Sequence, residues 1–129
     1  MAIPAELFGA FEHSALVKLN FSYYVSDPLA LRMGIILEGA LVSEWVFARD
    51  LVFSGMATQV GWGAISVWPT INNLIAIQIS GTEGRVLLRL SADILETFMG
   101  ETCDRVKYGE EFNNLDIGIT VARQCGLVT

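Results

Sequence analysis

The chain has 129 residues, 53% of them hydrophobic, a mean hydropathy of +0.50 and a formal net charge of −6 with only eight lysines and arginines. That charge balance disfavours nucleic acid and anionic membrane surfaces as partners, because both are bound mainly through cationic side chains. No apolar run reaches the ~18–20 residues of a membrane helix, and no secretory signal pattern is visible. We therefore expect one cytoplasmic domain over residues 1–129, without membrane insertion. Its surplus of apolar residues favours self-association.

Alternation of apolar and polar residues predicts the first two strands. The first fifteen residues are weakly patterned, and the alternation runs from Val17 to Val25, as in a half-buried strand. Ser26–Pro28 predicts a turn, because aspartate can bond its own backbone and proline fixes φ. A second alternating run, Leu31–Leu37, then predicts an antiparallel partner for the first strand.

A segment near the middle of the chain changes its backbone preference halfway. After Gly39, Leu41–Val46 predicts a strand that is rich in aromatic and β-branched residues. Ala48–Phe53 then predicts a short helix, which Ser54-Gly55 ends. We therefore expect a corner at which a strand passes directly into a helix.

Four side chains at this corner are candidates for a structural or partner-binding role. Trp45 and Phe47 share one strand face, so both can enter the core or a subunit interface. Arg49 and Asp50 are adjacent and do not face each other on a helix, so we expect them to contact different neighbours. Arg49 could bind carbonyl groups of the turn or be an exposed charged anchor for a partner, and the sequence leaves both possibilities open.

The second half of the chain predicts a three-stranded meander followed by a helix. The strands are Ala64–Trp68, Ile75–Ile79 and Val86–Leu90, with turns at Asn72-Asn73 and Gly81–Gly84. Ser91 predicts the N-cap of a helix. The apolar stripe of that helix is Ile94, Leu95, Phe98 and Met99, and Gly100 is expected to end or break it.

The residues from Asn114 onward allow two structures. Leu115, Ile117, Ile119 and Val121 alternate as in a strand, which their propensities favour. Asn114 could instead cap a helix that carries Ile117 and Val121 on one face.

The residue types of a catalytic or metal centre are sparse. His13 is the only histidine, so it cannot form a histidine-based metal cluster. Cys103 and Cys125 fit lone thiols in a reducing compartment better than a disulfide. Gly61–Ala64 lacks the ending of a phosphate-binding loop and precedes a predicted strand rather than a helix.

Two further groups of residues have a functional and a simpler interpretation. The acidic group Glu110, Glu111 and Asp116 is interpreted as a solvated loop in preference to a carboxylate site. The aromatic residues of the middle third could stack bases or line a small-ligand pocket, but only Arg49 lies near them in sequence, so packing in the core and between subunits is favoured. These residues are Trp45, Phe47, Trp62 and Trp68.

Several of these segments together resemble a known family. Glu44–Leu51, which reads EWVFARDL, is followed by Gly55, and Tyr23, Asp27-Pro28 and Ala30 lie upstream. Downstream, Gly61–Pro69 contains the sequence VWP, and Ile77–Gly84 continues the pattern. With these motifs the chain resembles the SsgA-like proteins of spore-forming actinobacteria over about residues 16–125, and its compact length is most similar to the SsgB branch.

The resemblance implies an α+β, Whirly-like fold with two small antiparallel sheets and a few helices, assembled as a homotrimer. It also implies a helix over Asn114–Gln124. The implied function is that of a non-catalytic adaptor at the division septum, which helps to recruit the tubulin-like protein FtsZ or to promote its assembly, with a second SsgA-like protein as a further partner. No enzymatic activity, cofactor or metal is implied. Single-stranded nucleic-acid binding on a Whirly-like fold is the alternative.

The residues of the family motifs that we expect to be structural or partner-binding are Trp45, Phe47, Arg49, Asp50, Trp68 and Pro69.

Overall fold

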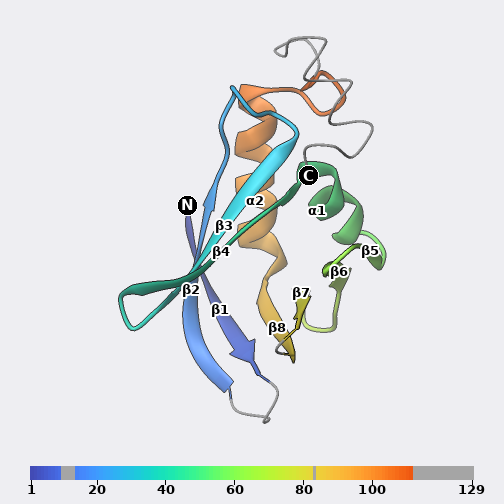
Figure 1. Ribbon diagram of the computed structural model, residues 1–129. Coiled ribbons are helices and arrows are strands. Elements are labelled where there is room, and N and C mark those ends of the chain that lie inside the picture. The colour runs from blue at the N-terminus through green and yellow to red at the C-terminus, as the bar shows by residue number, and fades with distance from the viewer. Residues whose placement is uncertain (10–13, 83, 112–129) are drawn as a thin grey trace.

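The computed structural model describes residues 1–9, 14–82 and 84–111. Across these residues, eight strands form one antiparallel sheet in the order β4-β3-β2-β1-β8-β7-β6-β5, accompanied by two helices (Figure 1). The strands are β1 (Ala2–Phe8), β2 (Ser14–Ser22), β3 (Ala30–Leu37), β4 (Ala40–Ala48), β5 (Val60–Trp62), β6 (Ile65–Pro69), β7 (Leu74–Gly81) and β8 (Gly84–Ser91). The helices are α1 (Arg49–Gly55) and α2 (Ala92–Arg105). The α+β class is confirmed.

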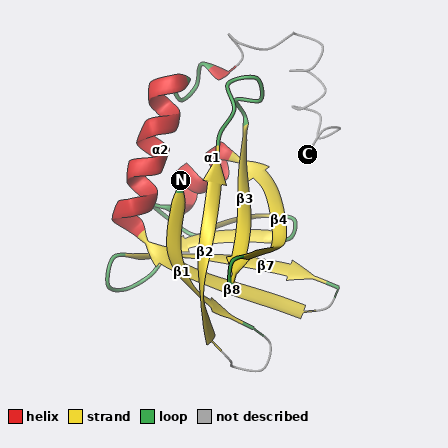
Figure 2. Ribbon diagram, turned by 90° about the vertical axis from the view of Figure 1, so that its left-hand side faces the viewer, coloured by secondary structure: helices red, strands yellow, loops and turns green. Residues whose placement is uncertain are grey.

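The expectation of two separate sheets is wrong, because β1 joins the two halves. It pairs with β2 along its whole length and with β8 over Ala5–Phe8, which lie opposite Leu87–Leu90. On the outer face of this seam Glu6 lies 3.7 Å from Arg89, whose guanidinium also lies 4.4 Å from the centre of the Phe8 ring. Figure 2 shows β1–β4 upright and β7 and β8 crossing behind them at a steep angle. The sheet is therefore continuous but strongly curled.

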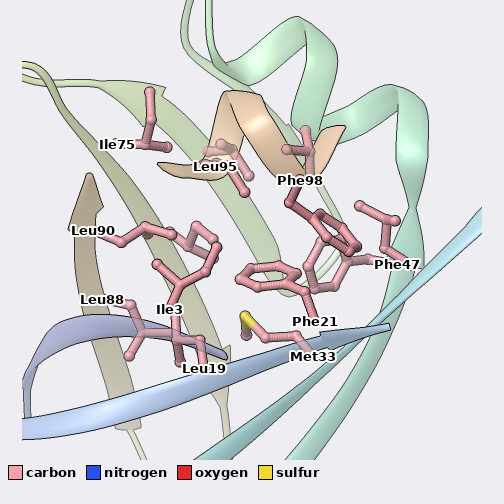
Figure 3. Packing of buried hydrophobic residues seen from close by; sticks show 14 of the residues in the cluster. Ile3, Leu19, Phe21, Met33, Phe47, Ile75, Leu88, Leu90, Leu95 and Phe98 are labelled. Carbon is pink, nitrogen blue, oxygen red and sulfur yellow. The ribbon is translucent and has the colours of Figure 1, made fainter. Parts of the chain in front are cut away.

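The curled sheet encloses the hydrophobic core. Alternate residues of each strand point inward, so that Val17, Leu19 and Phe21 of β2 are buried while Lys18 and Asn20 are exposed. Figure 3 shows side chains from both halves of the sheet meeting α2. The rings of Phe21 and Phe98 lie 5.4 Å apart. Burial of this apolar surface, at about 25 cal/mol per Å², holds the two halves together.

Helix α2 begins where the sequence predicts and continues past the predicted end. The Ser91 hydroxyl accepts a hydrogen bond from the backbone N–H of Ile94 at 3.3 Å, which confirms the N-cap. The expected end at Gly100 is wrong, because the helix runs to Arg105 and buries Thr102 beyond the glycine. Ile94 is exposed instead of lying in the predicted apolar stripe. Packing of the inner face thus outweighs the low helix propensity of one glycine.

Four other expectations concern the β4–α1 corner, the Gly61–Ala64 segment, the Asn114–Gln124 segment and membrane insertion. The corner after β4 is confirmed, with α1 beginning at Arg49 and ending at Gly55. Gly61–Ala64 forms the end of β5 and a hairpin turn in which Gly63 has a φ of +62°. The predicted element over Asn114–Gln124 lies outside the described residues. Neither described helix is long and apolar enough to cross a membrane.

Two glycines in helices provide a matched test of how closely α1 packs on the sheet. A Cβ atom at Gly55 would overlap the side chain of Val67 in β6, whereas a Cβ at Gly100 would meet no atom within 4 Å. We expect Gly55→Ala to lower the free energy of unfolding by about 1–3 kcal/mol through overpacking. Gly100→Ala should raise it by about 0.5–1 kcal/mol through helix propensity. Urea unfolding measures both, and a neutral Gly55→Ala would contradict this packing.

Candidate functional site

The centre of the β4–α1 corner is Arg49, the first residue of α1. Its side chain is buried, with 1% relative exposure. The possibility that Arg49 is an exposed anchor for a partner is therefore wrong. Its backbone N–H donates to the carbonyl oxygen of Leu29 at 2.8 Å, so the corner is also fastened to the loop that precedes β3.

The guanidinium of Arg49 binds the C-terminal end of α2 and the turn that follows. Nη1 donates to the carbonyl oxygens of Val106 at 2.8 Å and Thr102 at 3.2 Å. Nη2 donates to the carbonyl oxygen of Lys107 at 3.3 Å and to Glu111 Oε1 at 2.7 Å. The last carbonyls of a helix lack partners within it and carry partial negative charge, so a cation is stabilising there. Arg49 therefore binds carbonyls, as one of the two interpretations predicts, but they belong to a distant helix and turn and not to its own corner.

Three aromatic rings surround the same guanidinium. Its central carbon lies 5.0 Å from the ring centre of Tyr23, 5.7 Å from that of Phe53 and 5.9 Å from that of Tyr108. The rings of Phe53 and Tyr108 are 4.6 Å apart. The Tyr23 hydroxyl donates to the carbonyl oxygen of Pro28 at 2.8 Å. The upstream motif with Tyr23 and Pro28 and the central motif with Arg49 therefore meet in one cluster.

Glu111 supplies the negative charge that compensates Arg49. Burial acts to raise the pKa of its carboxyl group, but the hydrogen bond from Arg49, backbone donors and the guanidinium charge outweigh burial, so the pKa lies below its ordinary value. Burial also raises the pKa of the Tyr23 hydroxyl, with the positive charge of Arg49 acting in the opposite direction. The interpretation of Glu111 as part of a solvated loop is wrong, because its side chain is buried in an ion pair. Glu110 is exposed, and Asp116 lies outside the described residues.

The other residues of the predicted site do not gather around Arg49. Trp45 and Phe47 share the inner face of β4, where Phe47 is buried and Trp45 is half-buried. Asp50 is exposed in the first turn of α1. Trp68 is half-buried on β6 opposite Ala76, and Pro69 is exposed at the end of that strand. The motif residues thus belong to two halves of the sheet and to both its surface and its core.

The described residues were also compared with the requirements of a metal site. Among residues 1–9, 14–82 and 84–111, no group of three histidine, cysteine, aspartate or glutamate side chains could hold a metal ion. Cys103 is a half-buried free thiol. His13 and Cys125 lie outside these ranges.

Sequence reasoning missed the partners of Arg49 and an exposed apolar group on β4. The partners are 53 to 62 positions away in the chain, so no local pattern could indicate them. The exposed group consists of Leu41, Val42 and Val46, with relative exposures of 60%, 55% and 51%. Its position follows from the sheet order, which a single sequence does not determine.

Comparison with known proteins identifies the family. A sequence profile of the family described as Streptomyces sporulation and cell division protein, SsgA, matches residues 17–111. The chain belongs to the SsgA family. Among similar members, the sporulation-specific cell division protein SsgB of Streptomyces coelicolor is 33% identical over 109 residues, which are 82% of this chain and 80% of that protein. SsgB of Thermobifida fusca is 28% identical over 106 residues, or 80% and 77% of the two chains.

Solved structures of SsgA family members share this fold. An SsgB structure connected with longitudinal cell division during sporulation of Streptomyces coelicolor matches with a TM-score of 0.82 at 30% identity, covering 89% of this chain and 93% of that one. An SsgA-like sporulation-specific cell division protein from Thermobifida fusca matches with a TM-score of 0.83, covering 96% and 93%. At 24% identity, this second likeness shows the fold alone. The resemblance predicted from the motifs is confirmed.

The burial of Arg49 predicts a large loss of stability when the ion pair is broken. Arg49→Met would leave the Glu111 carboxylate buried without its partner, and we expect the free energy of unfolding to fall by about 3–5 kcal/mol. Lys18→Met also removes a cation, but from an exposed position on β2, and should change stability by less than about 0.5 kcal/mol. Urea unfolding of both variants checks the difference, and equal effects would contradict a structural role for Arg49.

The lowered pKa of Glu111 predicts a particular dependence of stability on pH. A carboxyl group whose pKa is lower in the folded state stabilises the protein above its unfolded pKa, near about 4.3. That stabilisation is lost as the pH falls through the folded value. Glu111→Gln should therefore be less stable than the parent at pH 7, and the difference should shrink below about pH 4.3. Glu110→Gln, at the exposed neighbour, is the control and should show no such convergence of urea midpoints.

Proposed function

We propose that this SsgA family member is a non-catalytic adaptor in sporulation-specific cell division that gathers FtsZ at septation sites in the cytoplasm. The observation that carries the proposal is the exposed apolar group Leu41, Val42 and Val46 on β4. Exposed apolar surface of this kind is typical of proteins that bind other proteins. The names of the relatives, which place SsgB in sporulation-specific cell division, supply the biological setting.

An adaptor needs accessible surface for its partners more than it needs reactive groups. The placement of charged residues in this chain supports a protein as the partner. The most deeply buried charged side chain of the described residues, Arg49, is engaged by helix carbonyls and Glu111 and so stabilises the fold. Its cationic head is not available to a nucleic-acid backbone. With a net charge of −6, the protein has little attraction for phosphate groups, so a protein partner is favoured over the single-stranded nucleic acid of the alternative function.

We further propose that the chain acts as a Whirly-like homotrimer and that a second SsgA-like protein helps to place it at the septum. A trimer would present three copies of any weak partner site. Binding to a filament with repeated sites could then exceed single-site affinity by ~10²–10⁴ where the geometry permits. Avidity of this kind suits a protein that collects filaments at one position.

Co-sedimentation with FtsZ tests the adaptor function. We expect the protein to pellet with GTP-assembled FtsZ at physiological salt and to stay in the supernatant when GDP prevents assembly. Light scattering of the purified protein should give three times the 14.1 kDa chain mass. Failure of a folded protein to pellet would contradict the FtsZ function, whereas salt-sensitive retention of single-stranded DNA would favour the nucleic-acid alternative.

A further inference from the structure

The two edges of the described sheet differ in length and in cover. At one edge, β5 has three residues, Val60–Trp62, and α1 packs against both β5 and β6. At the other edge, β4 has nine residues, Ala40–Ala48, and its only partner strand in the described part of the chain is β3 (Figure 2). A short, covered edge is a common protection against further strand pairing, and β4 does not have it.

The exposed side chains of β4 are unusually apolar for a strand at the edge of a sheet. The pairing of β3 with β4 shifts between Ile35 and Ile36, so that Ile35 lies opposite Ser43 and Ile36 opposite Leu41. Val42 is the extra residue of this bulge. Leu41, Val42 and Val46 are all exposed, and Glu44 is exposed between them. An exposed, long and apolar edge strand is a site at which another chain can add.

A cavity adjoins β4 on its inner side. It has a volume of about 410 Å³ and is lined by Trp45 of β4 together with Ile79, Arg85 and Val86 of the β7–β8 hairpin. Gly81 and Gly84 at the tip of the hairpin also line it and leave the backbone there open. A strand placed beside β4 would therefore meet regularly spaced main-chain groups from Ser43 to Ala48, beyond the bulge, and an open, largely apolar pocket under its inward side chains.

We propose that the edge of β4 binds an extended segment of a partner protein as a ninth strand. The partner segment has an apolar side chain that faces inward into the cavity beside Trp45. On its outward face it has a basic residue opposite Glu44, between apolar residues that lie against Val42 and Val46. Main-chain hydrogen bonds supply affinity, and the alternating side chains supply specificity. The inference rests on the proposed adaptor function and names the surface that would serve it.

Charge favours a basic partner segment over a second copy of this chain. Antiparallel pairing of two β4 strands that brings Val42 of each opposite Val46 of the other places the two Glu44 side chains opposite each other, which is destabilising. A segment with lysine or arginine at the outward position pairs with Glu44 and is attracted by the acidic protein.

A synthetic strand tests the proposal directly. The probe is a nine-residue peptide with four threonines and a central leucine on one face, and with valine, lysine, valine and threonine in that order on the other face. NMR titration and amide hydrogen exchange on the intact protein should show slower exchange along Ala40–Ala48 and unchanged exchange in Val60–Trp62. Replacing the leucine of the peptide with alanine, or introducing proline at a position that pairs with β4, should weaken binding about tenfold or more.

Charge reversal gives a matched pair of variants. Glu44→Lys should weaken binding of the lysine peptide about tenfold, and a peptide with glutamate in place of that lysine should recover it. Glu96→Lys makes the same charge change at an exposed position of α2 and should leave both affinities unchanged. If the two peptides bind Glu44→Lys and the parent alike, or if exchange slows elsewhere than β4, the proposal is overturned.

Other occupants of the edge would appear in the free protein. The informative amides are those of β4 that point away from β3, because the amides that point toward β3 are protected by that pairing in any case. Protection of the outward amides in the free protein overturns the proposal, and mixing differently labelled copies or truncating the chain after residue 111 shows whether a second copy or residues 112–129 cause it. The adaptor function is tested separately. Undiminished pelleting of Glu44→Lys with FtsZ would reject the β4 site and keep the function, whereas peptide binding at β4 without any pelleting would keep the site and reject FtsZ as the partner.

Discussion

The fold depends on a cation that is buried where three parts of the chain meet. Arg49 stands at the point where β4 becomes α1, and its guanidinium binds the end of α2 and Glu111. A buried charge is costly unless its hydrogen bonds and its counter-charge are both supplied. The helix carbonyls, the Glu111 carboxylate and the surrounding rings supply most of them, so the positions of α1, α2 and the turn to residue 111 are determined together. Loss of any one of these partners leaves an uncompensated group in the interior.

The motif Glu44–Leu51 therefore contributes residues both to the core and to the surface of the molecule. Along β4, Trp45 and Phe47 face the core while Glu44 and Val46 face solvent, as strand geometry requires. At Arg49 the chain enters α1 and the buried guanidinium binds the end of α2, while Asp50 is exposed. A change in this short segment can thus disturb folding, partner binding or both. Stability has to be measured alongside binding before any phenotype of such a change is assigned to a partner.

Local patterning was sufficient for much of this architecture, and its failures have physical causes. Strands with alternating apolar residues, the Ser91 cap and the β4–α1 corner follow from local rules. Strand β1 was missed because Pro4 lowers strand propensity; the structure accommodates this proline where β1 pairs with β2 alone, since pairing with β8 starts at Ala5. Strand β5 is too short to show a period. The environment of Arg49 and the free edge of β4 arise from contacts between distant segments, so neither could be predicted locally.

The seam between β1 and β8 has a consequence for the order of events in the cell. Residues 5–8 pair with residues 14–17 on one side and with residues 87–90 on the other, and only the second pairing joins the two halves of the sheet. The halves therefore cannot be joined until about two thirds of the chain has been made. Long-range pairing of this kind slows folding, because the intervening chain loses entropy before the contacts form. During translation the inner face of β1 and β2 therefore stays exposed to water until β8 has been made. A truncated product that ends before β8 could not join the two halves of the sheet.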